Sequence, residues 1–505
     1  MADYRYERLS ALDNSFLVFE SANTPMHVAS IAIFEAGPLT APHGGIDIER
    51  VTAYIGALLH RVPRYRERLA YIPIEGHPVW IDDERFNLNY HLRHTSLPKP
   101  GNERQLKRLA ARIMSQQLDR GKPLWETWIV EGLEGGRFAM ISKVHHCMID
   151  GISGVDLLAT ILSPTPEASV NDPVRWIPRP APSPGELLRD EILGRIKVPL
   201  GLAARLVREP AKVAAGVRDG LGALIETLSS GLHLADHTPL NQPIGPHRRF
   251  DWMTMDLSAV REVRQRLGGS LNDVVLAIVT GAVQRFLLQR NVAVDQLDFR
   301  AFVPVSLRGA ADHGTMGNRV AGWIVDLPVG EYDPRARLAE IRKATAKLKD
   351  SRQTRGTEIL TELTEWTGST VLSMAGRLAT QATPFNLVVT NVPGPPLPLY
   401  LLGARMLATF PMVPLFVNQG LGIALFSNAG KLFWGFNADW DVLPDLHDFV
   451  RAIEMSFADL CLAEPETIPA TKRHSRKPRR QGSHPRPNGD ATLHARQPVA
   501  PERHL

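Results

Sequence analysis

The segment that most constrains the fold of this chain is a strand-like run that ends in Val144-His-His-Cys-Met-Ile-Asp-Gly151. Residues 138–146 alternate as in a strand, so that even- and odd-numbered residues face opposite sides. His146 is the last of the even-numbered residues, which are mostly apolar. Asp150 and Gly151 then turn the chain into a mostly apolar, helix-like run. A histidine that is desolvated in this way stays neutral and can accept a proton, so we expect a general base at a tight turn.

The same segment allows other interpretations. Two histidines can simply close a strand as structural residues. Neighbouring strand residues point to opposite faces, and the sequence shows no spaced Cys or His cluster to supply further ligands, so we expect no metal site. Cys147 is either a nucleophile beside a histidine or an ordinary small residue, and we interpret it as the latter.

The pattern His-His-x-x-x-Asp-Gly resembles the signature of the chloramphenicol-acetyltransferase-like acyltransferases, which include peptide-synthetase condensation domains. Over about residues 5–465, further segments resemble, in order, the bacterial wax ester synthase/diacylglycerol acyltransferase family. These segments are Leu9-Ser-Ala-Leu-Asp-Asn-Ser-Phe16, Pro25-Met-His-Val28, Pro123-Leu-Trp125, Pro239-Leu-Asn241 with Gly245-Pro-His-Arg-Arg-Phe250, Ser270-Leu-Asn-Asp273, Pro304-Val-Ser-Leu-Arg308 with Gly317-Asn318, and Asn391-Val-Pro-Gly-Pro395.

The resemblance implies an α/β fold of two similar halves, each a mixed sheet flanked by helices, with a substrate tunnel between them. Acyl-CoA and an acceptor would enter from opposite mouths and meet away from water. His146 would accept the proton of the acceptor hydroxyl, and His145 would orient the loop. Asp150 would hold the loop by pairing with an arginine, for which Arg308 is the candidate, and Gly151 would permit the turn. No metal or cofactor is required beyond acyl-CoA as co-substrate.

Two asparagines of the second half are candidate substrate contacts. Asn272 lies in Ser270-Leu-Asn-Asp273, ahead of an apolar run at 274–288, and either caps a helix or faces a substrate oxygen. Asp273 fits a capping box, so we interpret it as structural. Asn391 follows the strand-like 387–390 and is expected in a rigid loop rather than in direct catalysis.

Length and composition fit two sizeable cores, because 44% of the 505 residues are apolar. We predict an N-terminal half at 1–165, a proline-rich linker and helical connector at 166–244, a C-terminal half at 245–465 and a disordered basic tail at 466–505. From Thr471 onward nine Lys or Arg residues face two acidic ones, a net charge of +7, so the rest of the chain carries about −2. The tail either contacts anionic lipid or nucleic acid or is simply solvated, and we favour solvation. The connector is either a membrane-surface helix or an ordinary interdomain helix.

The sequence has no uninterrupted apolar run of 18 residues, no secretory signal and two cysteines, so we expect a cytoplasmic enzyme that meets a membrane or lipid droplet from the side. The family resemblance implies a long-chain acyl-CoA donor and either diacylglycerol or a long-chain alcohol as acceptor, of which we favour diacylglycerol. No nucleic-acid partner is expected. The alternatives are a condensation-type enzyme acting on carrier-bound acyl groups and a lipid-binding protein without catalysis.

Overall fold

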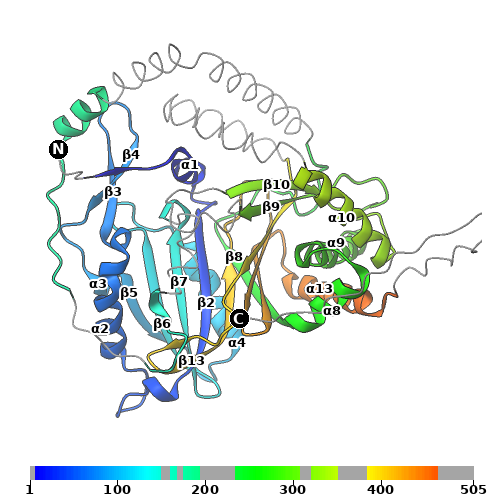
Figure 1. The fold of residues 1–505 in the computed structure, drawn as a ribbon, viewed down its shortest axis with the longest axis horizontal. Helices are drawn as coiled ribbons and strands as arrows, with labels where there is room; N and C mark the ends of the chain where they lie inside the picture. The colour runs from blue at the N-terminus through cyan, green and yellow to red at the C-terminus, as the bar shows by residue number, and fades with distance from the viewer. Residues whose placement is uncertain are drawn as a thin grey trace, which may run out of the picture. The chain divides into compact units, whose positions relative to one another are not determined.

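The computed structural model describes residues 6–148, 160–167, 174–193, 234–306, 320–350 and 384–464. Residues 1–465 form one compact unit. Within the described ranges, the strands form two six-stranded sheets and one three-stranded sheet, and helices flank both large sheets (Figure 1). Both large sheets contain parallel and antiparallel pairs. These features confirm the expected class, an α/β fold built on two mixed sheets.

The first sheet combines strands from both ends of the chain. Its spatial order is β12 (Tyr400–Leu401), β13 (Ala404–Met412), β2 (His27–Glu35), β7 (Arg137–His145), β6 (Trp125–Leu133) and β5 (Leu92–Ser96). Because strand side chains alternate between faces, Ala32 and Phe34 pack with helix α2 (Ile48–Leu58), whereas Ile31 and Ile33 pack with helix α4 (Glu103–Ser115). The sheet is therefore covered on both faces, and β7 is buried along almost its whole length.

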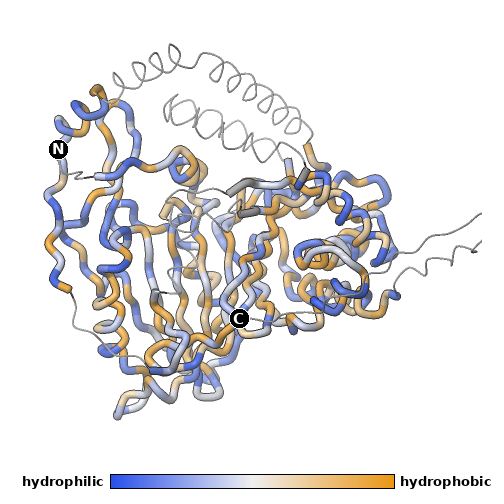
Figure 2. The backbone as a smooth tube through the Cα atoms, viewed as in Figure 1, coloured by the Kyte–Doolittle hydropathy of each residue, from blue (hydrophilic) through white to orange (hydrophobic). Residues whose placement is uncertain are grey.

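The second sheet lies against four helices of the C-terminal half. Its spatial order is β10 (Val320–Asp326), β9 (Arg300–Ser306), β11 (Leu387–Pro393), β14 (Leu421–Asn428), β15 (Lys431–Asp439) and β8 (Arg248–Asp256). The helices are α8 (Leu257–Leu267), α9 (Leu271–Gln289), α10 (Pro334–Asp350) and α13 (Leu446–Leu462). Apolar residues follow the strands of both sheets (Figure 2), and those that face the four helices form one continuous core.

Helix α9 begins where the capping pattern predicts and covers the expected apolar run. Ser270 accepts a hydrogen bond from the backbone N–H of Asp273, and the Asp273 carboxylate accepts one from the Ser270 N–H at 2.7 Å. This capping box confirms the structural interpretation of Asp273. By length and composition alone α9 could cross a membrane, but 78% of its most apolar window is buried inside the protein. It is the central helix of the second core.

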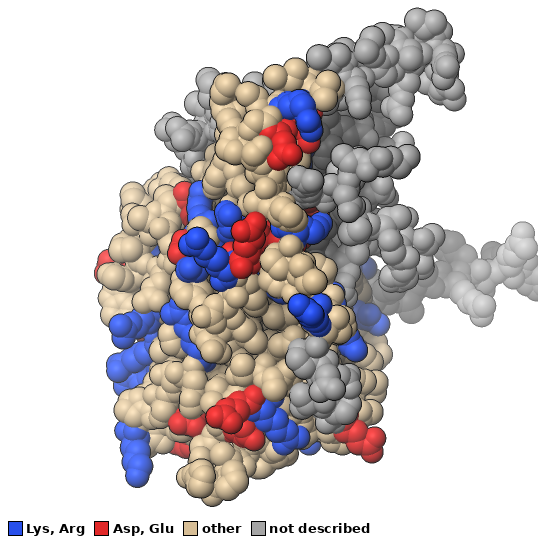
Figure 3. Space-filling view, turned by 90° about the vertical axis from the view of Figure 1, so that its left-hand side faces the viewer, with Lys and Arg blue, Asp and Glu red and all other residues tan. Residues whose placement is uncertain are grey.

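The N-terminal half also contains a small sheet and several short helices. The small sheet comprises β1 (Glu7–Arg8), β4 (Pro78–Asp82) and β3 (Glu67–Tyr71), and the short helices are α1 (Ala11–Phe19), α3 (Leu88–His91), η1 (Gly37–Leu39), η2 (Leu59–Arg61), η3 (Pro63–Arg66) and η4 (His146–Met148). Figure 3 shows basic and acidic side chains interspersed over one side of the molecule. Within the N-terminal half, Arg64 pairs with Glu7 and with Glu67.

The described part of the predicted linker is docked on the small sheet. Arg179 pairs with Asp82 at 2.7 Å and with Glu67 at 3.1 Å. Residues 174–183 form neither helix nor strand, as expected of a proline-rich linker, and 184–193 are helical. The remainder of the predicted connector, 194–233, and the tail lie outside the described residues.

The two halves share strands and a core, which the sequence did not predict. Strands β12 and β13 follow β11 in the chain but belong to the first sheet, where β13 pairs antiparallel with β2. Between the sheets, Trp252 of β8 stacks on Phe410 of β13 with ring centroids 4.6 Å apart and an interplanar angle of 8°. Both side chains belong to a core that also contains Ile31 and Ile141 of the first sheet. The domain boundary at residue 245 stays a prediction, but the sheets do not follow it strictly.

We expect the contact between the halves to dominate the stability of the compact unit. Phe410 is 3% exposed, so Phe410→Ala should lower the free energy of unfolding by about 3–5 kcal/mol through the cavity it leaves. Leu407→Ala on the same strand, at a side chain 40% exposed, should change it by no more than about 0.5 kcal/mol. Urea denaturation of both variants measures the difference, and equal losses would show that the two sheets do not depend on this core.

Candidate active site

The predicted histidine pair lies where β7 ends at the edge of the first core. Strand β7 stops at His145, and His146 begins the 3-10 turn η4. We expected His146 at the strand's end, so the boundary lies one residue earlier than predicted. The His146 N–H still donates to the carbonyl of Met26, the residue opposite it in the β2–β7 register, at 2.8 Å. This hydrogen bond fixes the backbone where the chain turns.

The ring of His146 is held against an aromatic side chain and is neutral. It stacks on Phe16 of α1, with centroids 3.8 Å apart and an interplanar angle of 18°. Burial among its neighbours lowers its pKa to about 4, with the neighbouring His145 as a smaller cause and a contact with its own backbone in partial opposition. Its Nδ1 is buried and makes no hydrogen bond of good geometry within the described part of the chain. The residue is half-buried, so the ring is not sealed from solvent. The lowered pKa has the direction expected for a neutral imidazole at this position, and the role of His146 as a base stays a prediction.

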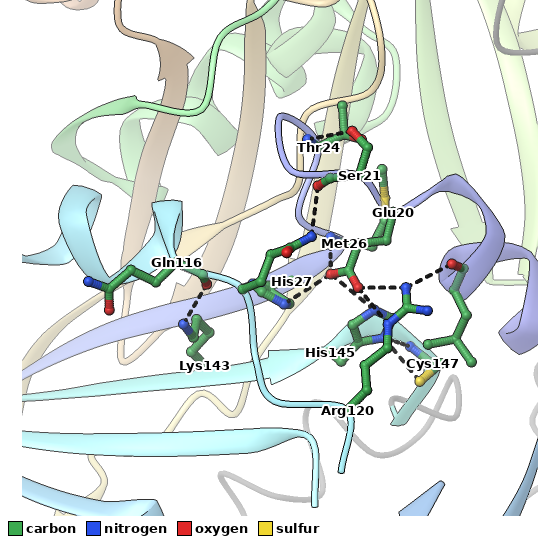
Figure 4. Close-up of polar contacts among 12 residues, drawn as sticks. Glu20, Ser21, Thr24, Met26, His27, Gln116, Arg120, Lys143, His145 and Cys147 are labelled. Carbon is green, nitrogen blue, oxygen red and sulfur yellow. Dashed lines mark hydrogen bonds and ion pairs between the residues drawn. The ribbon is translucent and has the colours of Figure 1, made fainter. Parts of the chain in front are cut away.

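His145 points to the other side and joins a buried polar cluster (Figure 4). It lies directly opposite His27 of β2 in the antiparallel pair, and both side chains are almost completely buried. Between the two imidazoles lies the carboxylate of Glu20, which follows α1: its Oε1 is 3.3 Å from His27 Nε2 and 3.5 Å from His145 Nε2. Arg120 donates to Oε2 of the same carboxylate at 2.7 and 3.0 Å.

Burial raises the pKa of Glu20, but its contacts with His145 and His27 outweigh that effect and hold the pKa far below its usual range. Burial is also the main cause that lowers the pKa of His27 to about 4. At neutral pH the cluster therefore contains one carboxylate, one guanidinium and an uncharged His27. The carboxylate and the guanidinium carry opposite charges, and this pairing allows the cluster to lie inside the protein.

Sequence reasoning missed Glu20, His27 and Arg120. Three potential metal-ligand atoms, from Glu20, His27 and His145, lie within 4.8 Å of one another. The spacing of residues in the sequence did not reveal this group, and the expectation of no metal site stays a prediction. The sequence offered one signal, because Pro25-Met-His-Val28 opens a strand whose antiparallel partner is β7. Glu20 and Arg120 carried no comparable signal, since they reach the cluster from outside the strands.

Lys143 anchors the same strand from its buried side. Its ammonium donates to the carbonyls of Ile113 and Gln116 at 2.9 Å each and pairs with Glu126 at 2.6 Å. The two carbonyls belong to the C-terminal end of α4, where backbone acceptors lack partners within the helix. Burial lowers the pKa of Lys143, and Glu126 opposes that shift. Helix α4 and strand β7 are therefore tied together two residues before His145.

Cys147 is poorly suited to act as a nucleophile. It is 3% exposed, and burial raises the pKa of its thiol well above the ordinary range. Its Sγ lies 3.0 Å from His145 Nδ1, and its backbone N–H donates to the same nitrogen at 3.1 Å. A thiol that stays protonated and buried fits the interpretation of Cys147 as an ordinary small residue.

The remaining predicted site residues divide into two groups. Asp150, Gly151 and Arg308 lie outside the described residues. Asn272 is the second residue of α9 and is half-buried. Asn391 was expected in a loop, but β11 continues to Pro393 through parallel pairing with β14, in which Asn391 lies opposite Leu425. The described contacts do not connect either asparagine to the histidine pair, and their substrate roles stay predictions.

A cavity of about 350 Å³ lies where the two halves meet. Its lining includes Glu103 of α4, Trp252 of β8 and Leu407 of β13. It does not include His145 or His146, so it is not the expected substrate tunnel. The tunnel stays a prediction.

Comparison with known proteins identifies the class to which this fold and site belong. The wax ester synthase/diacylglycerol acyltransferase catalytic domain matches residues 9–275, and the C-terminal domain of the same family matches 316–461. A putative diacylglycerol O-acyltransferase of Mycobacterium tuberculosis is 35% identical over 452 residues, 87% of each chain. A probable diacylglycerol O-acyltransferase of the same organism is 33% identical and covers 89% of this chain and 97% of its own.

Solved structures agree with these relatives. The wax ester synthase/diacylglycerol acyltransferase from Marinobacter aquaeolei VT8 is 25% identical, with a TM-score of 0.62 over 90% of this chain and 99% of its own. The starter condensation domain of rhizomide synthetase matches at a TM-score of 0.56 over 91% of this chain and 95% of its own, and at 13% identity it shows the shared fold alone. Fold and relatives together define an acyltransferase of the two-sheet, condensation-domain type. More narrowly, the chain belongs to the wax ester synthase/diacylglycerol acyltransferase family.

The neutral His27 predicts a loss of stability in mild acid. A histidine in the unfolded chain has a pKa of about 6.5, whereas burial lowers that of folded His27 to about 4. Between these values the unfolded chain binds a proton that the folded chain does not, so this contribution is complete above about pH 6.5 and is lost as the pH falls toward 4. We expect the melting temperature to fall over this range. His27→Gln, whose amide nitrogen replaces Nε2, should weaken the dependence, and an unchanged slope would contradict the assignment.

Proposed function

We propose that this protein is an acyl-CoA-dependent diacylglycerol O-acyltransferase that uses His146 as the proton acceptor. The observation that carries the proposal is the state of His146 itself. Its ring is half-buried and stacked on Phe16, and burial lowers its pKa to about 4, which is what a general base in a partly desolvated site requires. Membership in a family of O-acyltransferases supplies the reaction type.

In the proposed reaction, the acceptor oxygen attacks the thioester carbonyl carbon as His146 removes the hydroxyl proton. Collapse of the tetrahedral intermediate breaks the C–S bond, and the same imidazole returns the proton to the departing CoA thiolate. Because Nδ1 is the buried nitrogen, we assign the proton transfer to Nε2. A positioned base of this kind contributes about 10²- to 10⁴-fold to the rate. Asp150 and Arg308 keep their proposed role of holding the loop after the histidines.

Diacylglycerol is the proposed acceptor, and long-chain acyl-CoA is the proposed donor. The mycobacterial relatives are named as diacylglycerol O-acyltransferases, whereas the name of the Marinobacter relative also includes wax ester synthase. The deciding experiment offers labelled palmitoyl-CoA to the enzyme with diacylglycerol and hexadecanol in competition. Since both acceptors are lipids, we also propose that the protein works in the cytoplasm at the surface of a membrane or lipid droplet.

Replacing the proposed base should abolish transfer without unfolding the protein. His146→Ala should lower kcat by at least about 10²-fold, with a melting temperature near that of the unchanged protein because the half-buried ring makes few polar contacts. His145→Ala should cost less activity. Triacylglycerol formation is measured by thin-layer separation of the labelled products. Retention of more than about a tenth of the activity by His146→Ala would exclude His146 as the base.

The depressed pKa of His146 predicts activity well into mild acid. A general base must be unprotonated, and His146 stays so until the pH falls to about 4. The plot of kcat/KM against pH reports groups of the free enzyme, so its acid limb should lie near pH 4 rather than near 6.5. Initial rates measured where the protein stays folded test this. An acid limb near 6.5 would mean that water reaches the ring freely.

A further inference from the structure

The carboxylate of Glu20 is the centre of the buried cluster and is almost fully enclosed, with 3% of its side chain exposed. Its two oxygens have separate partners (Figure 4). Oε2 accepts both hydrogen bonds from Arg120, and Oε1 faces the two imidazoles and accepts from the Met26 N–H at 3.3 Å. Arg120 neutralises the charge, so Oε1 is left for the groups around the turn at His146.

The contacts of His145 define which nitrogen of its ring carries the proton. Its Nδ1 lies 3.1 Å from the backbone N–H of Cys147, which is a donor only. Nδ1 therefore accepts this hydrogen bond, which leaves Nε2 as the donor nitrogen, and Nε2 faces Glu20 Oε1 at 3.5 Å. The ring joins the carboxylate on one edge to the peptide that follows His146 on the other.

The peptide group that precedes His146 leads to the same carboxylate. The His146 N–H donates to the Met26 carbonyl at 2.8 Å, and the Met26 N–H donates to Glu20 Oε1. Each of the two backbone N–H groups that flank the His146 Cα is thus linked to Glu20 through one intervening residue, either Met26 or His145. Few single side chains can reach both.

We propose that Glu20 is a positioning residue for acyl transfer, which holds both backbone N–H groups that flank His146 through Met26 and His145. The inference rests on the proposed role of His146 as the base. Glu20 acts through geometry, because a base displaced by about 1 Å from the attacking hydroxyl loses about 10²-fold in rate.

The same atoms do not favour a bound metal ion. A metal on Nε2 of His145 would need that nitrogen free of its proton, and the proton would then lie on Nδ1, against the donor N–H of Cys147. Arg120 would add a second positive charge next to the ion. We therefore interpret the three close ligand atoms as a hydrogen-bonded network, and metal binding is an outcome that the experiment can detect.

The central variant is Glu20→Gln in the full chain, assayed by steady-state kinetics below its melting temperature. We expect kcat to fall by about 10²-fold while KM for acyl-CoA changes by less than about twofold. The acid limb of the pH profile should keep its position. If Glu20 instead acted through its charge on the pKa of His146, the substitution would shift that limb.

Glu126→Gln is the matched control. Glu126 of β6 is also a buried carboxylate with a cationic partner, Lys143 of β7, but its contacts among the described residues do not reach the turn at His146. Both variants should lower the melting temperature, and only Glu20→Gln should lower kcat substantially. Equal losses of kcat would overturn the proposal, and so would an unchanged kcat in Glu20→Gln.

A double-mutant cycle tests the route through His145. In His145→Asn, the amide oxygen can replace Nδ1 as acceptor for Cys147, while the link to Glu20 is lost. This variant should resemble Glu20→Gln, and the double variant should be no more than about twofold slower than either, since both changes break one connection. Multiplied losses would overturn the proposal. If Glu20→Gln does not fold, His145→Asn still tests the proposal, because a wild-type kcat in His145→Asn would exclude the link from Glu20 through His145.

Two further outcomes separate this inference from the proposed function. If His146→Ala were active, the assignment of His146 as the base would be excluded. If His146→Ala were inactive but Glu20→Gln fully active, only the positioning role of Glu20 would be excluded. Zn²⁺ alone is added to the wild-type protein as the metal probe. If one equivalent of Zn²⁺ bound to the wild-type protein but not to His27→Gln, and chelation abolished activity, the cluster would be a metal site and not a hydrogen-bonded network.

Discussion

The hydrogen bonding of β2 along both of its edges is the constraint on which the rest of the structure depends. On one edge it pairs with β7 over nine residues, from His27 opposite His145 to Glu35 opposite Arg137. On the other edge it pairs with β13, which the chain supplies from the far end of its sequence. Strand β2 therefore fixes the register of two strands, β7, which leads into the histidine pair, and β13, which joins the two halves.

Polar chemistry at one end of that element is possible because charges are balanced inside the protein. Glu20 and Arg120 form a neutral pair, and the two imidazoles lie 3.3 and 3.5 Å from the other oxygen of the carboxylate. Lys143 and Glu126 form a second buried pair two residues away. Burying one of these ions without its partner would be costly, so each pair is maintained as a unit. His146 lies beside this polar region but faces Phe16, and its low pKa comes from the apolar side.

Much of the fold was predictable from sequence because its elements are long and regular. The run at 274–288 lies within α9, the strand before the histidine pair lies within β7, and the capping box at Ser270 was located correctly. The position of His146 directly after β7 followed from the alternation of residues before it. The Glu20 cluster did not, because it depends on a strand pairing and on two side chains from separate loops. The sharing of β12 and β13 between the halves was equally hidden, since neither composition nor periodicity records which sheet a strand joins.

The position of β13 in the first sheet has a consequence for how the protein is made. Residues that pair across β2 and β13 are about 380 positions apart in the chain. When synthesis runs from the N-terminus, β2 can meet β7 early, but its other edge lacks a partner until the chain has passed Met412. During that interval an apolar strand edge is open to pairing with other chains. The last step in building the N-terminal sheet therefore belongs to the C-terminal quarter of the chain, and truncation there would leave the first half with an unprotected edge.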